Sequence, residues 1–233
     1  MKASKRILLL TTVALVIVAA AACKNSLKKV SAPETESVAD ESPWAGVYDI
    51  QTSVGTIRIG LYKDTPYHAE NFAKLVREEY YNDILFHRVI AGFMIQTGDP
   101  LTRDTLVELY GTGGPDYTLP AEFVPEHRHI KGAVAAARLG DFANPMKESS
   151  GSQFYIVLSE NGCRHLDGQY TVFGETLEGL DVVDKIGASP TDPYDRPLTP
   201  VKIISVKKVE PAIEEPDELN NAKCEESSNI TEE

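Results

Sequence analysis

Short apolar runs separated by glycines, with only two helical patterns among them, are the feature that most restricts the fold of this chain. In the run 55–62, Ile57, Ile59 and Leu61 recur at every second position, the period expected for a strand with one face in a core. The preceding run 47–52 predicts a partner strand, joined to it in a hairpin. The same kind of pattern predicts further strands over residues 84–90, 93–97, 132–137, 153–158, 171–173 and 201–206.

Two segments carry a helical pattern instead. Thr65 and Pro66 predict an N-cap and a first helical position, and the apolar spacing that follows predicts a helix over about 66–79. A second helix is indicated by the spacing of Leu177, Leu180, Val183 and Ile186. Many short strands with two helices favour a closed barrel or a sandwich, because closure removes exposed strand edges.

The N-terminus predicts an export signal. Three basic residues precede an uncharged run of 16 residues, 7–22, which is shorter than the roughly 20 apolar residues of a membrane span. Four alanines lead directly into Cys23, a pattern that resembles a bacterial lipobox. We therefore expect a signal peptide over 1–22, lipidation of Cys23 and an exported protein anchored to a bacterial membrane, facing the periplasm. Ordinary cleavage after an Ala-x-Ala motif, which leaves a soluble periplasmic protein, is the alternative.

The rest of the chain divides into a tether, one domain and a tail. Residues 23–43 are polar, contain two prolines and predict a lipidated N-terminus with a flexible tether. Residues 210–233 hold nine acidic residues and one lysine, which predicts a disordered acidic tail. Between them, residues 44–209 number 166, an ordinary size for one domain.

Charge and composition exclude several classes of function. The formal net charge of -12 argues against nucleic acid as a partner, because phosphate backbones attract the opposite charge. Three cysteines without a close spacing argue against a zinc module or a disulfide scaffold. His127 and His129 lie in a polar segment that predicts a surface loop rather than a metal site. The chain also lacks a Gly-x-Ser-x-Gly motif and a phosphate-binding glycine loop.

Three blocks in order carry the chemistry. They read FHRVIAGFMIQTGD (86–99), GSQFYI (151–156) and HLDGQYTVFG (165–174), and the segment GAVAAAR (132–138) precedes the second block. These blocks resemble the signature of the cyclophilins, which are peptidyl-prolyl isomerases, over essentially all of residues 47–209. The resemblance implies a mainly β fold, a closed eight-stranded antiparallel barrel capped by two α-helices.

The reaction itself explains why no nucleophile or metal is needed. An X-Pro bond isomerises over a barrier of about 18 to 20 kcal/mol that amide resonance sets, and no bond is broken. A catalyst must hold proline in a dry pocket and favour the twisted amide. The resemblance implies no cofactor and no metal, and it implies proline-containing segments of exported proteins as partners of a monomeric enzyme.

The resemblance also implies roles for individual residues. Arg88 would donate hydrogen bonds toward the prolyl amide as it twists, and Gln96 would orient Arg88 and contact the substrate. The implied catalytic residues are Arg88, Gln96, Phe93 and Tyr155, and the implied substrate-binding residues are Met94, Ala137, Arg138, His165, Leu166 and Tyr170.

Four features depart from the family pattern. His165 stands where many relatives have tryptophan, a residue associated with tight cyclosporin binding, and Tyr170 stands where many have histidine. Tyr155 replaces a phenylalanine of the pocket, so its hydroxyl needs a partner at the pocket wall. Residues 101–110 are an insertion that predicts a partly ordered surface excursion.

Three functions remain open on this reading. The first is an enzyme that assists the folding of exported proteins. The second is a proline-peptide-binding or chaperone module of the same fold with little catalysis, although such relatives often lose the arginine that Arg88 provides. The third is a lipoprotein whose domain is only a spacer, and the complete set of pocket residues argues against it.

Overall fold

The computed structural model describes residues 42–210, so the predicted signal peptide, Cys23, and nearly all of the tether and of the acidic tail lie outside the described residues. The elements follow in this order: β1 (Trp44–Thr52), β2 (Gly55–Tyr62), α1 (Pro66–Arg77), β3 (Arg88–Ile90), β4 (Met94–Thr97), η1 (Pro100–Arg103), η2 (Val107–Leu109), β5 (Thr118–Leu119), β6 (Ala133–Ala136), β7 (Ser149–Ser150), β8 (Phe154–Val157), η3 (Arg164–Leu166), β9 (Val172–Glu178), α2 (Leu180–Gly187) and β10 (Ile203–Lys208). Neither helix of this range is long and apolar enough to cross a bilayer.

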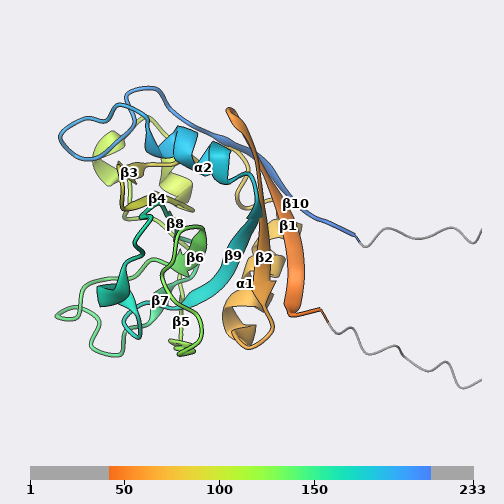
Figure 1. Cartoon of the computed structure of the whole chain (residues 1–233). Helices are drawn as coiled ribbons and strands as arrows, with labels where there is room; N and C mark the ends of the chain where they lie inside the picture. Colours follow the sequence, from red (N-terminus) through yellow and green to blue (C-terminus); the bar gives the residue numbers. More distant parts are fainter. Residues whose placement is uncertain (1–41, 211–233) are drawn as a thin grey trace, which may run out of the picture. The chain divides into compact units, whose positions relative to one another are not determined.

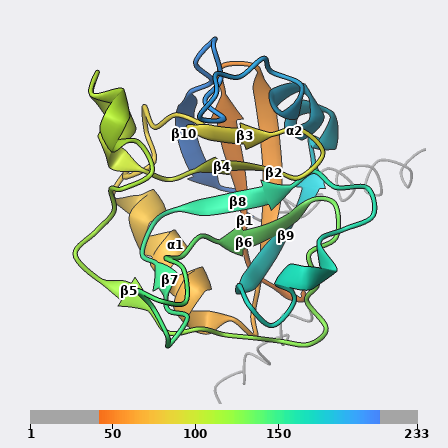
Figure 2. The same ribbon diagram turned by 90° about the vertical axis from the view of Figure 1, so that its left-hand side faces the viewer.

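One antiparallel sheet of eight strands dominates the fold, in the order β10-β1-β2-β9-β6-β8-β4-β3, and β5 pairs with β7 separately. Figure 1 shows β6 and β8 on the opposite side of the domain from β1 and β10, because the sheet curls. Figure 2 shows β3, β4, β8 and β6 side by side across the front. The predicted mainly β fold with eight antiparallel strands and two α-helices is confirmed.

The predicted closure of the barrel is not confirmed, because the two ends of the curled sheet do not pair as strands within residues 42–210. β3 and β10 are the edge strands of the sheet. The segments that precede them meet through an antiparallel bridge between Leu85 and Lys202. Two backbone bonds support it, from the Phe86 amide to the Val201 carbonyl at 2.9 Å and from the Ile203 amide to the Ile84 carbonyl at 2.8 Å. This pairing occupies residues 84–86, so β3 is shorter than the strand predicted over 84–90.

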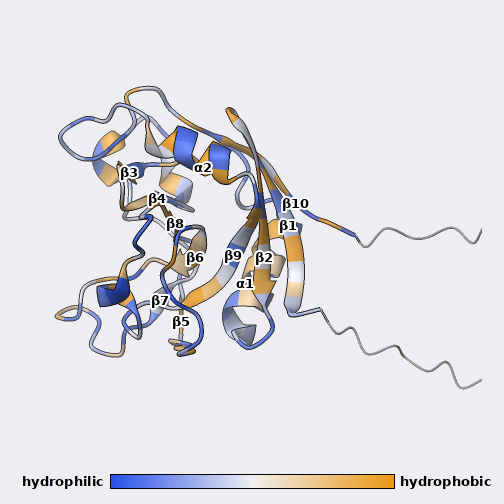
Figure 3. Cartoon of the chain, in the orientation of Figure 1, coloured by the Kyte–Doolittle hydropathy of each residue, from blue (hydrophilic) through white to orange (hydrophobic). Residues whose placement is uncertain are grey.

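The predicted hairpin of the two first strands is confirmed, and its apolar face builds the core. Ile57, Ile59 and Leu61 have no exposed surface, as the period of two predicted. Figure 3 shows the apolar residues along β1, β2 and β9. Phe72 of α1 packs onto this face, with ring centroids 5.3 Å from Tyr48.

Helix α1 begins where the sequence predicts, but a different side chain caps it. Thr65 stands at the N-cap position, and its side chain makes no capping hydrogen bond. The carboxylate of Glu122 instead accepts from the backbone amides of Tyr67 and His68, at 3.1 and 3.0 Å, and contacts His68 Nδ1 at 2.6 Å. Burial raises the pKa of Glu122, but these bonds outweigh it and lower the pKa. A negative charge is favourable at this end of the helix dipole.

The second helix is shorter at its start than the apolar spacing indicated. Leu177 lies in β9, so its assignment to the helix was wrong, and α2 begins at Leu180 after Gly179. Gly179 has a φ of +86°, and a Cβ there would lie 2.3 Å from the carbonyl oxygen of Thr56. The left-handed backbone and this close approach end the strand and set the start of the helix.

The predicted insertion over 101–110 lies largely at the surface, with residues 103–109 exposed. It contains the 3-10 helix η2 and all of η1 except its first residue, Pro100. Buried Asp99 holds its two ends, because its carboxylate accepts from the backbone amides of Leu101 at 2.8 Å, of Gly113 at 3.2 Å and also of Gly111.

Candidate active site

Three of the four predicted catalytic residues form one row across neighbouring strands. Arg88 of β3 lies opposite Gln96 of β4, and Gln96 lies opposite Tyr155 of β8. Antiparallel neighbours of this kind place their side chains on the same face of the sheet. The local strand register therefore brings together residues that lie 67 positions apart in the sequence, from 88 to 155.

The predicted proline pocket coincides with a separate apolar cluster, which we call the pocket cluster. Its buried members are Met94, Ala133, Ala135, Tyr155, Val157, Cys163 and Val172. Phe93, Ala137, Leu166 and Tyr170 are partly buried against it. His165 is exposed, and its ring stacks over that of Phe93 with centroids 6.3 Å apart. The structure thus brings together six predicted residues in one cluster and places His165 at its edge.

A cleft of about 680 Å³ lies beside this row of residues. Its lining includes Arg88, Gln96 and Arg138, together with residues of η2 and of the loop that precedes β10. His87, which also lines the cleft, is buried, and burial lowers its pKa to about 4. This histidine is neutral at pH 7, so the fixed positive charges of the cleft come from its arginines.

Arg88 has a partner that the sequence did not indicate. Its Nε lies 3.5 Å from a carboxylate oxygen of Asp195, and the Asp195 carbonyl accepts from the Val89 amide at 2.8 Å. Asp195 has a φ of +63°, an uncommon conformation for this residue type. Neither terminal nitrogen of Arg88 has a hydrogen-bond partner within residues 42–210. These donors are free to meet a substrate.

Gln96 contacts a different residue from the one expected. Its amide nitrogen donates to Gln153 Oε1 at 2.9 Å, and the amide of Gln153 donates to the carbonyls of Gly111 and Gly113 at 3.1 and 2.7 Å. This chain of amides connects the row of site residues to the segment that directly follows the insertion. The orienting role of Gln96 toward Arg88 stays a prediction, and the geometry adds Gln153 as a residue that fixes the Gln96 amide.

The hydroxyl of Tyr155 finds the partner that its burial requires. It lies 3.0 Å from His129 Nε2, and His129 Nδ1 lies 2.9 Å from a carboxylate oxygen of Asp167. A carboxylate can only accept, so Nδ1 of the neutral ring carries the proton, and Nε2 accepts from the tyrosine. Burial raises the pKa of Tyr155 and lowers that of His129. Both groups are therefore neutral at pH 7.

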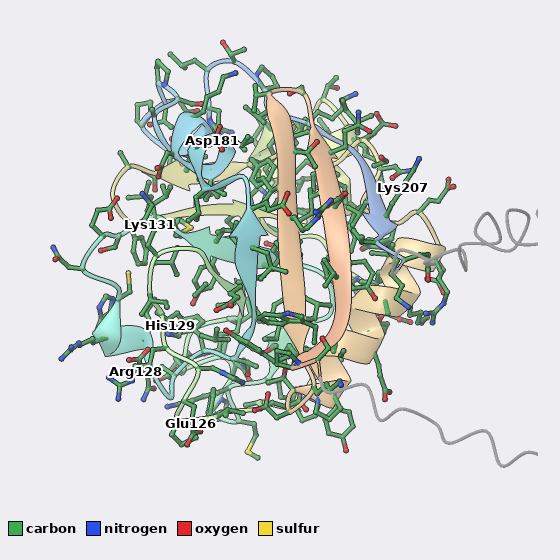
Figure 4. All side chains as sticks on the ribbon, turned by 45° about the vertical axis from the view of Figure 1, so that its right-hand side comes forward. Glu126, Arg128, His129, Lys131, Asp181 and Lys207 are labelled. Atoms are coloured by element: carbon green, nitrogen blue, oxygen red, sulfur yellow. The ribbon has the colours of Figure 1, made fainter. Side chains whose placement is uncertain are left out.

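The expectation of a surface loop was wrong for His129, which is buried. Figure 4 labels it beside Arg128, on the stretch that leads to Lys131 and β6. The polar composition of this stretch hid the histidine because its partners, Tyr155 and Asp167, are distant in sequence. His127 stacks on Tyr62 instead, with ring centroids 3.6 Å apart.

Arg138 is fixed along the wall of the site. Its side chain is 4% exposed, its Nε donates to the Gln169 carbonyl at 2.8 Å, and its guanidinium lies 4.4 Å from the centre of the Tyr170 ring. A guanidinium over an aromatic face is favourable. The predicted substrate-binding residues Arg138 and Tyr170 therefore contact each other directly.

Comparisons with known proteins agree on one family. Residues 47–208 match the model of the cyclophilin type peptidyl-prolyl cis-trans isomerases. A protein of Aspergillus fumigatus named peptidyl-prolyl cis-trans isomerase-like 1 is 36% identical over 160 residues, which cover 68% of this chain and 92% of that protein. The human protein of the same name is 36% identical over 156 residues, which cover 66% of this chain and 87% of that protein.

Solved structures agree with these matches. The crystal structure of a cyclophilin type peptidyl-prolyl cis-trans isomerase of Cryptosporidium parvum has a TM-score of 0.63 and 26% sequence identity. The alignment covers 71% of this chain and 98% of that one. A second structure of that protein was determined in the presence of the dipeptide Ala-Pro, with the same TM-score.

Proposed function

This chain belongs to the cyclophilin-type peptidyl-prolyl cis-trans isomerase family, and from that premise we propose which residues carry the reaction and where the enzyme works. The activity is isomerisation of X-Pro bonds in proline-containing peptides. In our proposal, the pocket cluster holds the pyrrolidine ring between Phe93, Met94, Tyr155 and Leu166. Arg88 acts on the amide from the neighbouring cleft.

The observation that carries this proposal is the placement of Arg88 next to an apolar pocket. As the amide twists, resonance is lost and the prolyl nitrogen regains its lone pair. A guanidinium donor favours that state over the planar ground state, and this difference is what lowers the barrier. Asp195 engages Nε, and the two terminal nitrogens supply the donors.

The test is Arg88→Ala, assayed with a short X-Pro peptide. We expect kcat/KM to fall by about 10² to 10³, which corresponds to the roughly 2.7 to 4 kcal/mol lost when one preorganised donor is removed. Arg88→Lys, which keeps the charge but not the planar fork, should recover only part of the loss. The side chain is 44% exposed, so both variants should keep the stability of the wild type. Full turnover in a folded Arg88→Ala protein would exclude the proposed role.

The place of work is the second part of the proposal. The charged start of the chain, the apolar run 7–22 and Cys23 support export and lipid anchoring, with the enzyme assisting the folding of exported proteins as a monomer on the periplasmic side. Cys23→Ser should leave an uncleaved precursor or a soluble exported protein whose isomerase activity is intact. An unmodified N-terminus at Cys23, found by mass spectrometry of the wild type, would contradict lipidation and favour simple cleavage.

A binding module with little catalysis is the other candidate. The terminal nitrogens of Arg88, which have no hydrogen-bond partner within residues 42–210, favour the enzyme over this alternative, since a module that only captures proline needs no free donor beside its pocket. Tight binding of a proline peptide by a protein with no measurable turnover would favour the binding module.

A further inference from the structure

The loop between β6 and β7 presents three large apolar side chains to solvent. We call residues 139–148 the rim loop. In it, Leu139 is 68% exposed, Met146 is 75% exposed, and Phe142 has a relative exposure of 105%, which means that it packs against nothing. Single exposed apolar residues are ordinary, but three on one short loop form a candidate interaction surface.

The rim loop is held in place at its base. The Arg138 guanidinium donates to the Leu139 carbonyl at 2.9 Å and pairs with Asp141 at 2.7 Å. The Ser150 amide donates to the Ala137 carbonyl at 2.8 Å, which joins the two ends of the loop. Inside it, the amides of Ala143 and Asn144 both donate to the Gly140 carbonyl at 3.0 Å. These hydrogen bonds and the ion pair hold the loop backbone in a defined turn, which presents the three apolar side chains to solvent.

The residues that hold the rim loop in place also contact residues of the substrate site. Lys147 Nζ donates to the side chain of Gln169, and Arg138 donates to the Gln169 carbonyl, so the loop is fastened next to Tyr170 of the pocket cluster. Arg138 also lines the cleft that contains Arg88. Leu139 follows Arg138 directly in the chain, so the rim loop begins where this lining of the cleft ends.

We propose that the rim loop binds apolar side chains of unfolded polypeptide that flank the proline, so that the enzyme prefers unfolded proteins to short peptides. This proposal rests on the proposed location of the substrate site. An unfolded chain exposes the aliphatic and aromatic side chains that Leu139, Phe142 and Met146 can cover, whereas a folded protein buries them. Each such contact removes apolar area from water on both partners.

Charge favours an unfolded polypeptide as the partner of the rim loop over a bilayer or a second copy of this chain. The chain carries a formal net charge of -12, which opposes contact of the rim loop with an anionic bilayer even when Cys23 tethers the chain to a membrane, and also opposes the association of two copies. Within the loop, Asp141 and Glu148 outnumber Lys147. This repulsion does not apply to an unfolded substrate that carries no net negative charge.

The experiment compares two substrates on the full chain and on a triple variant, Leu139→Ser, Phe142→Ser and Met146→Ser. With an unfolded protein whose refolding is limited by a proline, we expect KM to rise by about tenfold or more. With a short X-Pro peptide, we expect kcat/KM to stay within about twofold. Ile204→Ser is the matched control, because Ile204 is an apolar residue of β10 that is 47% exposed, on the far side of the domain from β6.

Several results would overturn the proposal. Unchanged KM for the unfolded protein, or an equal loss with both substrates, excludes a separate binding surface on the rim loop. If sedimentation shows that the wild type forms dimers and the triple variant does not, the loop binds a second copy of this chain instead. Binding to vesicles of anionic phospholipid that the variant loses assigns it to a bilayer. If wild type lacks peptide turnover, the proposed function fails, and the anisotropy of a labelled, permanently unfolded chain still decides whether the rim loop binds it.

Discussion

The domain contains two apolar clusters that are equally well buried at their centres but differ in what surrounds them. In the main core, Phe72 contacts Tyr48, Tyr81 and Phe154 with ring centroids 5.0 to 5.8 Å apart. In the pocket cluster, buried Met94 and Tyr155 border partly exposed side chains. The hydroxyl of Tyr155 leads to His129 and Asp167, and Arg138 lies along the wall.

Under the proposed function, this difference separates residues that stabilise the fold from residues that bind the substrate. The main core consists of buried side chains from the sheet and from both helices, α1 and α2, so its contacts stabilise the folded state. The pocket cluster leaves apolar surface open to a ligand and adds polar groups whose hydrogen bonds fix that surface in place. A substitution in the first cluster should therefore change the free energy of unfolding, and one in the second should change turnover.

Phe72→Ala tests the main core and should have the largest effect on stability. We expect the free energy of unfolding to fall by about 3 to 5 kcal/mol, the range for removal of a buried phenylalanine, with kcat/KM per folded molecule unchanged. Urea denaturation and a peptide assay measure the two quantities. Phe93→Ala, in the partly exposed wall of the pocket, is the matched control and should give the reverse pattern. Equal effects of both variants on both quantities would contradict the separation of the clusters.

Protonation of His87 at low pH should destabilise the side of the domain that carries the cleft. His87 lines this cleft and is neutral in the folded state at pH 7. Burial depresses its folded pKa to about 4 from an unfolded value of about 6.5, so the unfolded state binds the proton first. The associated stability is fully present above about pH 6.5 and is lost as pH falls toward 4, by about 3 kcal/mol in total.

A matched variant isolates this contribution from other titrating groups. His87→Gln cannot titrate, so its free energy of unfolding should fall less steeply between pH 6.5 and 4 than that of the wild type. Unfolding curves at a series of pH values give both slopes. Parallel slopes would show that His87 titrates alike in the folded and unfolded states.

The polar chain behind the pocket gives a smaller effect. His129→Leu should lower the free energy of unfolding by about 1 to 3 kcal/mol, because it leaves the buried Tyr155 hydroxyl without its acceptor. Tyr155→Phe removes the hydroxyl, so the double variant should recover much of that loss. A double-mutant cycle measures the coupling. Additive losses in the two single variants would mean that the bond between the two residues contributes nothing.

Local patterns predicted the fold well because their causes lie within a few residues. The alternation of Ile57, Ile59 and Leu61 depends only on strand geometry, and Thr65-Pro66 marked the start of α1 correctly. Leu177 was misassigned because apolar spacing alone does not separate the end of a strand from the first turn of a helix. The left-handed Gly179 is the local signal that marks the boundary.

The sequence motifs predicted which side chains belong to the site but not which residues hold them in place. The blocks named the side chains that converge in the pocket cluster. The partners that fix them, Asp195 for Arg88 and His129 for Tyr155, come from segments brought close by the fold, and no spacing in the sequence indicates them. Glu122, which caps α1 from 54 residues away, was missed for the same reason.

The edge of the pocket cluster gives the smallest predicted effect. His165 is exposed and stacks on Phe93 at an interplanar angle of 24°, so a larger ring at this position should extend the apolar wall. His165→Trp should tighten cyclosporin binding by about 1 to 2 kcal/mol, from the added area at about 25 cal/mol per Å². Calorimetric titration measures the affinity, and Ile204→Trp on β10 controls for a new exposed indole. An affinity that does not move in His165→Trp would place this residue outside the ligand-binding surface and limit the pocket to Phe93 and the buried members of the cluster.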